Sequence, residues 1–153
     1  MREKGYTLIE LLVVTALIGI IVAIAVPNLI SAMQRARQKR TMADMRAVCE
    51  GIEMYHVDMS HFPVYTTVNA EALAGDLVIY MKRFNSRDGW NTSFSYVSNG
   101  RNYTVSSHGS DRYLDDDFIG GPTTDYRNDI VFSDGVFVQW PEGVQRSPTT
   151  GIG

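Results

Sequence analysis

The sequence predicts an α+β fold in which a long N-terminal hydrophobic helix packs on a small antiparallel sheet. Three observations predict it. The 24 residues from Leu11 to Gln34 include no charged side chain. Apolar residues then recur at helical spacing over 45–55, and four short alternating segments follow, in pairs that flank turn residues. The chain has 153 residues, 44% hydrophobic and 20% charged, which is typical of one folded domain.

The apolar run from Leu11 to Val26 admits three interpretations, because about 20 apolar residues suffice to cross a membrane as a helix. A secretory signal peptide is a poor match, since the small residue Gly5 precedes the run and Pro27-Asn28 after it is an unsuitable cleavage site. A plain membrane anchor leaves Glu10 unexplained, because a carboxylate at the mouth of such a segment is costly unless paired. The third interpretation is an anchor cleaved before the run, whose acid has a defined partner.

The helix is predicted to continue past the apolar run, from Tyr6 to about His56. Pro27 removes a backbone hydrogen bond, so a kink or local melting is expected over 22–27. Beyond it, five apolar residues define a buried stripe at i, i+3, i+4 and i+7 spacing: Met45, Val48, Cys49, Ile52 and Tyr55. The sulfur of Cys49 is expected to be a small core group rather than a nucleophile.

A connector is predicted over 57–85. His61-Phe62-Pro63 ends the long helix, and Asn69 is expected to cap a short helical piece that reaches Ala74. The tail over 147–153 is polar and glycine-rich and is expected to be loose.

Four strands are predicted after the connector, in two hairpins. Asn99-Gly100 and Asp134-Gly135 supply the positive φ angles of the two tight turns. The strands are Phe94–Val97, Tyr103–Ser107, Ile130–Ser133 and Val136–Trp140. Strands this short need a surface to pack on, and the helical stripe offers one.

Charge and cysteine content exclude several classes of function. Residues 1–50 carry seven Lys/Arg and four Asp/Glu, whereas residues 51–153 carry seven and thirteen. A nucleic-acid-binding domain has the opposite balance, so no nucleic-acid partner is expected. The single cysteine excludes an intramolecular disulfide and a multi-cysteine zinc site. The three histidines lack the i, i+4 spacing of a helical zinc site, and no catalytic motif occurs, so the chain is not expected to be an enzyme.

The segment 111–134 is strongly acidic, with seven aspartates and two arginines. Aspartates and glycines in a loop between strands are typical of a site for a hard cation such as Ca²⁺, which takes six to eight oxygen ligands. The spacing does not fit an EF-hand. Composition alone therefore leaves open a cation site and a solvated acidic loop.

Residues 4–12, Lys-Gly-Tyr-Thr-Leu-Ile-Glu-Leu-Leu, resemble the cleavage and methylation motif of the type IV pilin superfamily, and the position of Pro27 matches as well. The resemblance implies a pilin fold, cleavage between Gly5 and Tyr6, and N-methylation of Tyr6. It also implies that Glu10 neutralises the N-terminus of a neighbouring subunit in a filament. The implied organisation is a leader peptide over 1–5, a membrane and filament-core helix over 6–34, and a periplasmic α+β domain over 35–153.

Four further segments resemble the major pseudopilin of type II secretion: Asp88-Gly89-Trp90-Asn91, Tyr103-Thr104-Val105, His108-Gly109-Ser110-Asp111 and Asn128-Asp129-Ile130. In that family a loop binds calcium through aspartates and backbone carbonyls. The resemblance implies Asp111 as the first ligand, the backbone carbonyl of His108 as another, and Asp129 or Asp125 as the later aspartate. The loop here is longer and adds Leu114-Asp115-Asp116-Asp117, which leaves the second aspartate ligand open.

By resemblance the chain is a structural subunit of a secretion pseudopilus. The implied partners are further copies of itself, minor pseudopilins, an inner-membrane assembly platform, prepilin peptidase and, before assembly, the membrane. The implied location is the bacterial inner membrane, crossed once, with the C-terminal domain in the periplasm. The positive-inside rule alone favours the opposite topology, because two basic residues precede the apolar run and four follow it closely. Two alternatives remain: the major pilin of a type IVa pilus for motility, adhesion or DNA uptake, and a membrane-anchored binding module that never polymerises.

Overall fold

The computed structural model describes residues 6–115 and 118–146. The predicted leader, which contains Gly5, and the predicted loose tail over 147–153 lie outside the described residues. The chain divides into two compact units, 1–33 and 34–153.

Helix α1 spans Leu8–Met59 and contributes to both units. It begins two residues after the predicted start and ends three residues after His56. Pro27 lies inside α1 and the helix is continuous across it, so the local melting predicted over 22–27 is absent. The Asn28 side-chain amide donates to the Ile24 carbonyl at 3.1 Å. Pro27 has no backbone N–H to donate within this turn, whereas the Asn28 side chain supplies an additional N–H donor. The added hydrogen bond helps to keep the turn helical.

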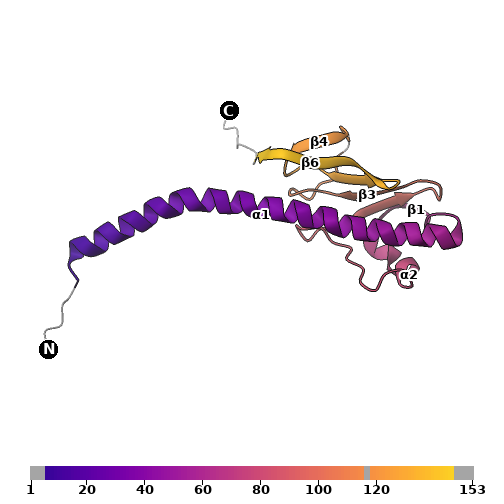
Figure 1. Ribbon diagram of the computed structural model, residues 1–153, viewed down its shortest axis with the longest axis horizontal. Helices are drawn as coiled ribbons and strands as arrows, with labels where there is room; N and C mark the ends of the chain where they lie inside the picture. Colours follow the sequence, from indigo (N-terminus) through magenta and orange to yellow (C-terminus); the bar gives the residue numbers. More distant parts are fainter. Residues whose placement is uncertain (1–5, 116–117, 147–153) are drawn as a thin grey trace. The chain divides into compact units, whose positions relative to one another are not determined.

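The second unit contains a six-stranded sheet with the order β1-β2-β3-β5-β6-β4. All neighbouring strands are antiparallel except β4 and β6, which are parallel. The strands are β1 (Tyr65–Asn69), β2 (Ser95–Ser98), β3 (Tyr103–Ser107), β4 (Gly121–Asp125), β5 (Ile130–Ser133) and β6 (Val136–Arg146). Figure 1 shows the strands alongside the C-terminal half of α1. The α+β fold class is thereby confirmed.

The four predicted strands are present, with β2 shifted by one residue and β6 longer than expected. The count of four is wrong, because β1 and β4 complete the sheet at its two edges. Strand β4 begins Gly121-Pro122. Proline has no N–H to donate to a ladder and is tolerated on edge strands, so a pattern that normally marks a turn here begins a strand. Strand β1 has a register shift between Tyr65 and Val68, which interrupts its alternation.

The connector contains the 3₁₀ helix η1 (Ala70–Leu73) followed by the short helix α2 (Ala74–Leu77). Asn69 occupies the N-cap position of η1 but its side chain makes no capping hydrogen bond. The predicted Asn69 cap is therefore wrong as a side-chain interaction, and the helical piece extends three residues beyond Ala74.

The core of the second unit lies between α1 and the sheet. Four members of the predicted helical stripe are almost completely buried, and Tyr55 packs against the same cluster. On the sheet side the core contains Phe94, Tyr96, Tyr103, Val105, Ile130 and Phe132. Cys49 is a free, buried cysteine within this cluster, as predicted. The helical stripe therefore determines which face of α1 meets the sheet.

Candidate functional site

The first candidate site is the start of α1, where Thr7 and Glu10 form a capping box. One oxygen of the Glu10 carboxylate, Oε2, accepts hydrogen bonds from the Thr7 backbone N–H and from the Thr7 hydroxyl, both at 2.9 Å. In return, the Glu10 backbone N–H donates to the Thr7 hydroxyl oxygen at 3.3 Å. These reciprocal bonds satisfy donors that an open helix end would leave unpaired.

The capping box holds the Glu10 carboxylate against Thr7, the residue that follows Tyr6. The Tyr6 side chain is exposed. The Glu10 carboxylate, the predicted acceptor for a terminal amine, thus lies at the N-terminal end of the helix. Sequence analysis identified Glu10 but missed Thr7. The Thr-x-x-Glu spacing of a capping box was the signal that could have found it.

The apolar part of α1 that follows is exposed throughout. Among the described residues, α1 is the only helix long and apolar enough to cross a membrane, with a mean hydropathy of 2.9 and none of that window buried. Pro27 lies at the end of this stretch. An apolar surface of this extent marks a contact with lipid or with other protein chains. By length and composition, the helix fits anchoring in a membrane.

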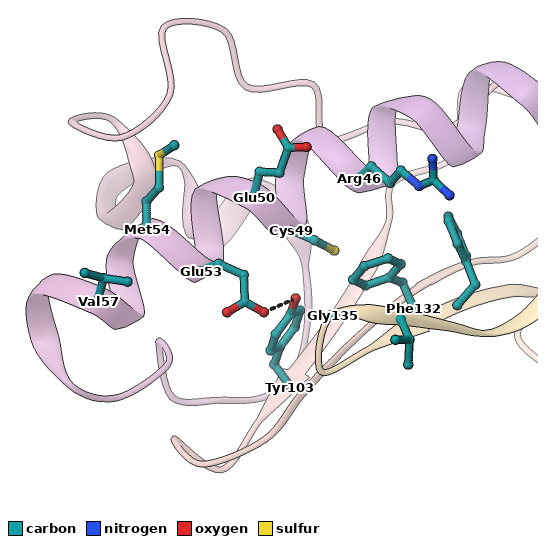
Figure 2. Close-up of a pocket in the computed structure, with 11 residues that line it drawn as sticks. Arg46, Cys49, Glu50, Glu53, Met54, Val57, Tyr103, Phe132 and Gly135 are labelled. Atoms are coloured by element: carbon teal, nitrogen blue, oxygen red, sulfur yellow. Dashed lines mark hydrogen bonds between the residues drawn. The ribbon is translucent and has the colours of Figure 1, made fainter.

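A groove in the second unit runs between α1 and the hairpin formed by β5 and β6 (Figure 2). Its volume is about 740 Å³, and its lining is mostly apolar with three charged side chains. The lining residues are Arg46, Cys49, Glu50, Glu53, Met54, Val57, Tyr103, Phe132, Gly135, Val136 and Phe137. The Tyr103 hydroxyl donates to Glu53 at 2.8 Å across its floor. Burial raises the pKa of the Cys49 thiol, which keeps that thiol protonated and unreactive.

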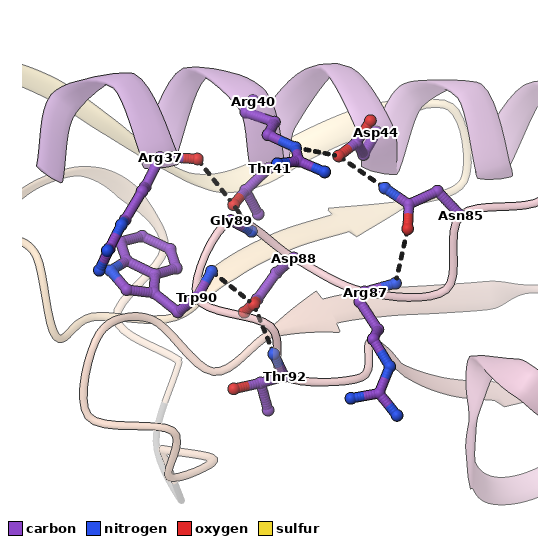
Figure 3. A network of polar contacts seen from close by, with 10 residues as sticks. All are labelled: Arg37, Arg40, Thr41, Asp44, Asn85, Arg87, Asp88, Gly89, Trp90 and Thr92. Carbon is purple, nitrogen blue, oxygen red and sulfur yellow. Dashed lines mark hydrogen bonds and ion pairs between the residues drawn. The ribbon is translucent and has the colours of Figure 1, made fainter. Parts of the chain in front are cut away.

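The Asp88-Gly89-Trp90-Asn91 segment docks a loop onto α1 (Figure 3). One oxygen of the buried Asp88 carboxylate accepts from the backbone N–H groups of Trp90 and Thr92 at 2.9 and 2.8 Å. The other oxygen accepts from the Ser107 hydroxyl of β3 at 2.8 Å. The carboxylate therefore ties the loop to the end of the strand that leads into the acidic segment.

The same loop contacts the helix through two further hydrogen bonds. The Gly89 N–H donates to the Thr41 hydroxyl at 2.8 Å, and the Trp90 indole N–H donates to Gln34 at 2.7 Å. A side chain at Gly89 would overlap the backbone of Arg37, so only glycine permits this approach. The motif that resembles the pseudopilin family is thus a docking element between loop, helix and strand.

The acidic segment contains the predicted calcium ligands, and the structure brings its two ends together. The Ser110 N–H donates to the Tyr126 carbonyl at 2.9 Å. Gly109, at φ +60°, lies against the backbone of Arg127 without room for a side chain. The His108 ring nitrogen Nε2 bonds the Ser95 hydroxyl at 2.8 Å. The segment before Asp111 is therefore held directly beside the segment before Asp129.

Asp129 is the most unusual of the predicted ligands. It is fully buried, and its Oδ1 accepts no hydrogen bond from any described residue. Its Oδ2 accepts from the Asp115 backbone N–H at 3.0 Å. Burial raises the pKa of Asp129 to about 7, and the charges of Asp115 and Asp111 add to the rise, whereas the hydrogen bond from Asp115 opposes it. A buried carboxylate oxygen that accepts no hydrogen bond suits a cation ligand, because a bound cation would supply the interaction that this oxygen lacks.

Asp125 lies in a different environment. Its carboxylate forms an ion pair with Arg127, with an Nη2–Oδ2 distance of 2.9 Å, and also accepts the Arg127 backbone N–H. Burial alone would raise the pKa of Asp125, but the hydrogen bonds and charge of Arg127 hold it below its usual value. Asp111 accepts the Tyr113 backbone N–H at 3.2 Å.

The carboxylates converge without forming a finished site. Across residues 6–115 and 118–146, no group of three or more histidine, cysteine, aspartate or glutamate side chains is arranged to hold a metal ion. The donors that do meet are oxygens, which fits a hard cation by type. Asp115 from the loop insertion contacts Asp129, an arrangement that sequence analysis did not identify because it depends on the path of the loop.

Two protein families match the chain. Residues 1–26 match the prokaryotic N-terminal methylation motif, and residues 28–118 match type II secretion system protein G. The first match contains the predicted cleavage residues and Glu10. The second contains the C-terminal half of α1, the docking loop and the start of the acidic segment. No solved structure shows a significant match to the chain.

Relatives point to the same family. The type II secretion system core protein G of Vibrio cholerae is 30% identical over 114 residues, which cover 68% of this chain and 77% of that protein. The protein of the same name from Dickeya chrysanthemi is 30% identical over 133 residues, covering 78% and 86%. The type IV wide pilus major component PilA4 of Thermus thermophilus is 41% identical, but over 61 residues that cover 40% and 47%. The chain therefore belongs to the type II secretion system protein G family, the major pseudopilins.

Proposed function

We propose that the chain is a structural, non-enzymatic subunit that polymerises into a pseudopilus for type II protein secretion. The observation that carries the proposal is the exposed apolar half of α1 headed by a single, positioned carboxylate. Such a helix needs an apolar environment, which a bilayer supplies before assembly and neighbouring helices supply afterwards. The charge at its start then determines how neighbouring helices align.

In the proposed filament, the Glu10 carboxylate forms an ion pair with the N-terminal ammonium group of Tyr6 in a neighbouring subunit. An unpaired carboxylate in an apolar helix bundle costs several kcal/mol, so pairing sets the axial register as well as the stability. Thr7 occupies one Glu10 oxygen and orients the carboxylate. The second oxygen, Oε1, is then the one that faces the incoming amine.

Maturation precedes assembly in this proposal. Prepilin peptidase cuts between Gly5 and Tyr6, and the new amine of Tyr6 is methylated, in agreement with the match of residues 1–26 to the methylation motif. The apolar helix crosses the inner membrane once, with residues 35–153 in the periplasm. The partners are further copies of the chain, minor pseudopilins and the inner-membrane assembly platform.

A calcium ion is proposed to close the acidic segment. The residues that would hold it include the Asp111 and Asp129 carboxylates and the backbone carbonyl of His108. The buried, unpartnered oxygen of Asp129 supports this assignment, since a bound cation would satisfy it. Of the two candidates for the later aspartate, Asp129 is favoured because Asp125 is already paired with Arg127. Bound calcium would neutralise charge there and join the two ends of the loop.

Electron microscopy of cells that overproduce the wild-type chain tests the proposal. Filaments are expected with calcium, and they are expected to be lost when the cells are grown with a chelator. Filaments that are indifferent to calcium would favour an ordinary type IV pilus, the alternative that the similarity to PilA4 supports over 61 residues of the chain. Absence of filaments under every condition would favour a membrane-anchored module that does not polymerise.

Replacing Thr7 by valine is expected to reduce filament yield several-fold. Valine has the shape of threonine but lacks the hydroxyl that bonds Glu10, and loss of such a cap costs about 1 kcal/mol. The amount of sheared filament, measured by immunoblot, reports the effect. Thr7→Ser keeps the hydroxyl and is expected to restore the yield, whereas equal yields for valine and wild type would exclude a positioning role.

A further inference from the structure

The inserted part of the acidic loop contacts the buried carboxylate of Asp129 through Asp115. The two residues exchange hydrogen bonds in both directions. The Asp115 N–H donates to Asp129 Oδ2 at 3.0 Å, and the Asp129 N–H donates to Asp115 Oδ2 at 3.3 Å. Each carboxylate therefore lies against the backbone of the other residue, and the two negative charges are close together.

Among residues 6–115 and 118–146, no basic side chain forms an ion pair with Asp115 or Asp129. Asp129 is fully buried and its Oδ1 accepts no hydrogen bond from any described residue, although Oδ2 is satisfied. Of the two arginines of this segment, Arg127 is engaged by the Asp125 carboxylate, and Arg112 donates to the Trp90 carbonyl at 3.4 Å. Two adjacent carboxylates, one of them desolvated, repel each other, and a divalent cation bound by both would remove the repulsion.

We propose that Asp115, which belongs to the longer loop of this chain, is a calcium ligand. Asp115 and Asp129 would then both bind the ion, and Asp115 would be the additional aspartate ligand that the longer loop supplies. Asp125 does not take that role, because its ion pair with Arg127 would have to break first. The inference rests on the proposed calcium site and names its ligands. It gives the insertion a function, since binding of calcium through Asp115 would tether the inserted residues to the start of β5.

Calcium titration of the full-length protein in detergent, by calorimetry and by thermal unfolding, tests the assignment. Calcium is expected to raise the melting temperature of the wild type. Asp115→Asn is expected to weaken calcium binding by at least about tenfold, as even the loss of groups outside the ligand shell costs 10–100-fold at metal sites. Asp125→Asn, the matched control, is expected to bind calcium within about twofold of the wild type, which is well below that range.

The calcium-free melting temperature separates a ligand from a merely structural residue. Asparagine at 115 can still accept the Asp129 N–H, and it removes one of two repelling charges, so the calcium-free variant is expected to be at least as stable as the wild type. Wild-type affinity in Asp115→Asn, or weakened binding in Asp125→Asn alone, would overturn the assignment while leaving the calcium site standing. No calcium-dependent shift in the wild type would overturn the calcium site and this assignment together.

Discussion

Cells that produce the Glu10→Ala variant are expected to form no filaments, although residues 34–153 remain folded. The substitution removes the proposed acceptor for the neighbouring Tyr6 amine and leaves that ammonium group unpaired among apolar helices, at a cost of about 3–5 kcal/mol per subunit. It also opens the capping box with Thr7. Electron microscopy and immunoblots of sheared filaments measure assembly, and circular dichroism of the purified chain measures folding.

The Glu10→Gln variant separates charge from capping. Glutamine keeps the shape of the side chain and can still accept the Thr7 N–H, so it preserves the helix start while removing the negative charge. If charge neutralisation aligns the subunits, the Glu10→Gln variant is expected to form almost as few filaments as the Glu10→Ala variant. Abundant filaments from Glu10→Gln would show that capping alone is needed, and abundant filaments from both variants would refute the role proposed for this residue.

Replacing Asp88 by alanine is expected to destabilise the second unit by about 3–5 kcal/mol. The buried carboxylate accepts from two backbone N–H groups and one hydroxyl, and each buried donor that loses its acceptor costs about 1–3 kcal/mol. The loop that carries Gly89 and Trp90 would then lose its connection to the end of β3. Chemical unfolding of the full-length protein in detergent, followed by tryptophan fluorescence and circular dichroism, measures the loss.

Two controls accompany this variant. Asp88→Asn retains an acceptor oxygen for the backbone N–H groups and is expected to lose much less stability. The exposed Asp58, changed to alanine, is expected to stay within about 0.5 kcal/mol of the wild type, as surface substitutions usually do. An Asp88→Ala protein as stable as the Asp58→Ala protein would mean that the loop is held mainly by its contacts with Thr41 and Gln34.

Local patterns predicted those elements of the fold whose side chains alternate or repeat against the core. The stripe from Met45 to Ile52 is buried because its spacing matches one face of a helix, and the hairpin turns at Gly100 and Gly135 have the positive φ angles that their residues favour. Strand β4 was not predicted, because it pairs with β6 in parallel and no tight turn joins the two strands.

The candidate sites divide in the same way. Glu10 stands out in the sequence because a lone acid in an apolar run is costly, and the pair of Asp125 and Arg127 is separated by one residue and could have been expected from charge alone. The contact between Asp115 and Asp129 joins residues 14 positions apart. It depends on the path of the chain at Asp115, which lies against the residue before β5, and no local periodicity encodes that path.

The unburied apolar surface of α1 has a consequence for the energetics of a growing filament. Lipid tails are as apolar as the leucine and isoleucine side chains of a neighbouring helix, so transfer of the helix from bilayer to filament core releases little hydrophobic free energy. The hydrophobic contribution to assembly is therefore small. In the proposed filament, the pairing of Glu10 with the neighbouring N-terminal amine then sets the direction of this transfer.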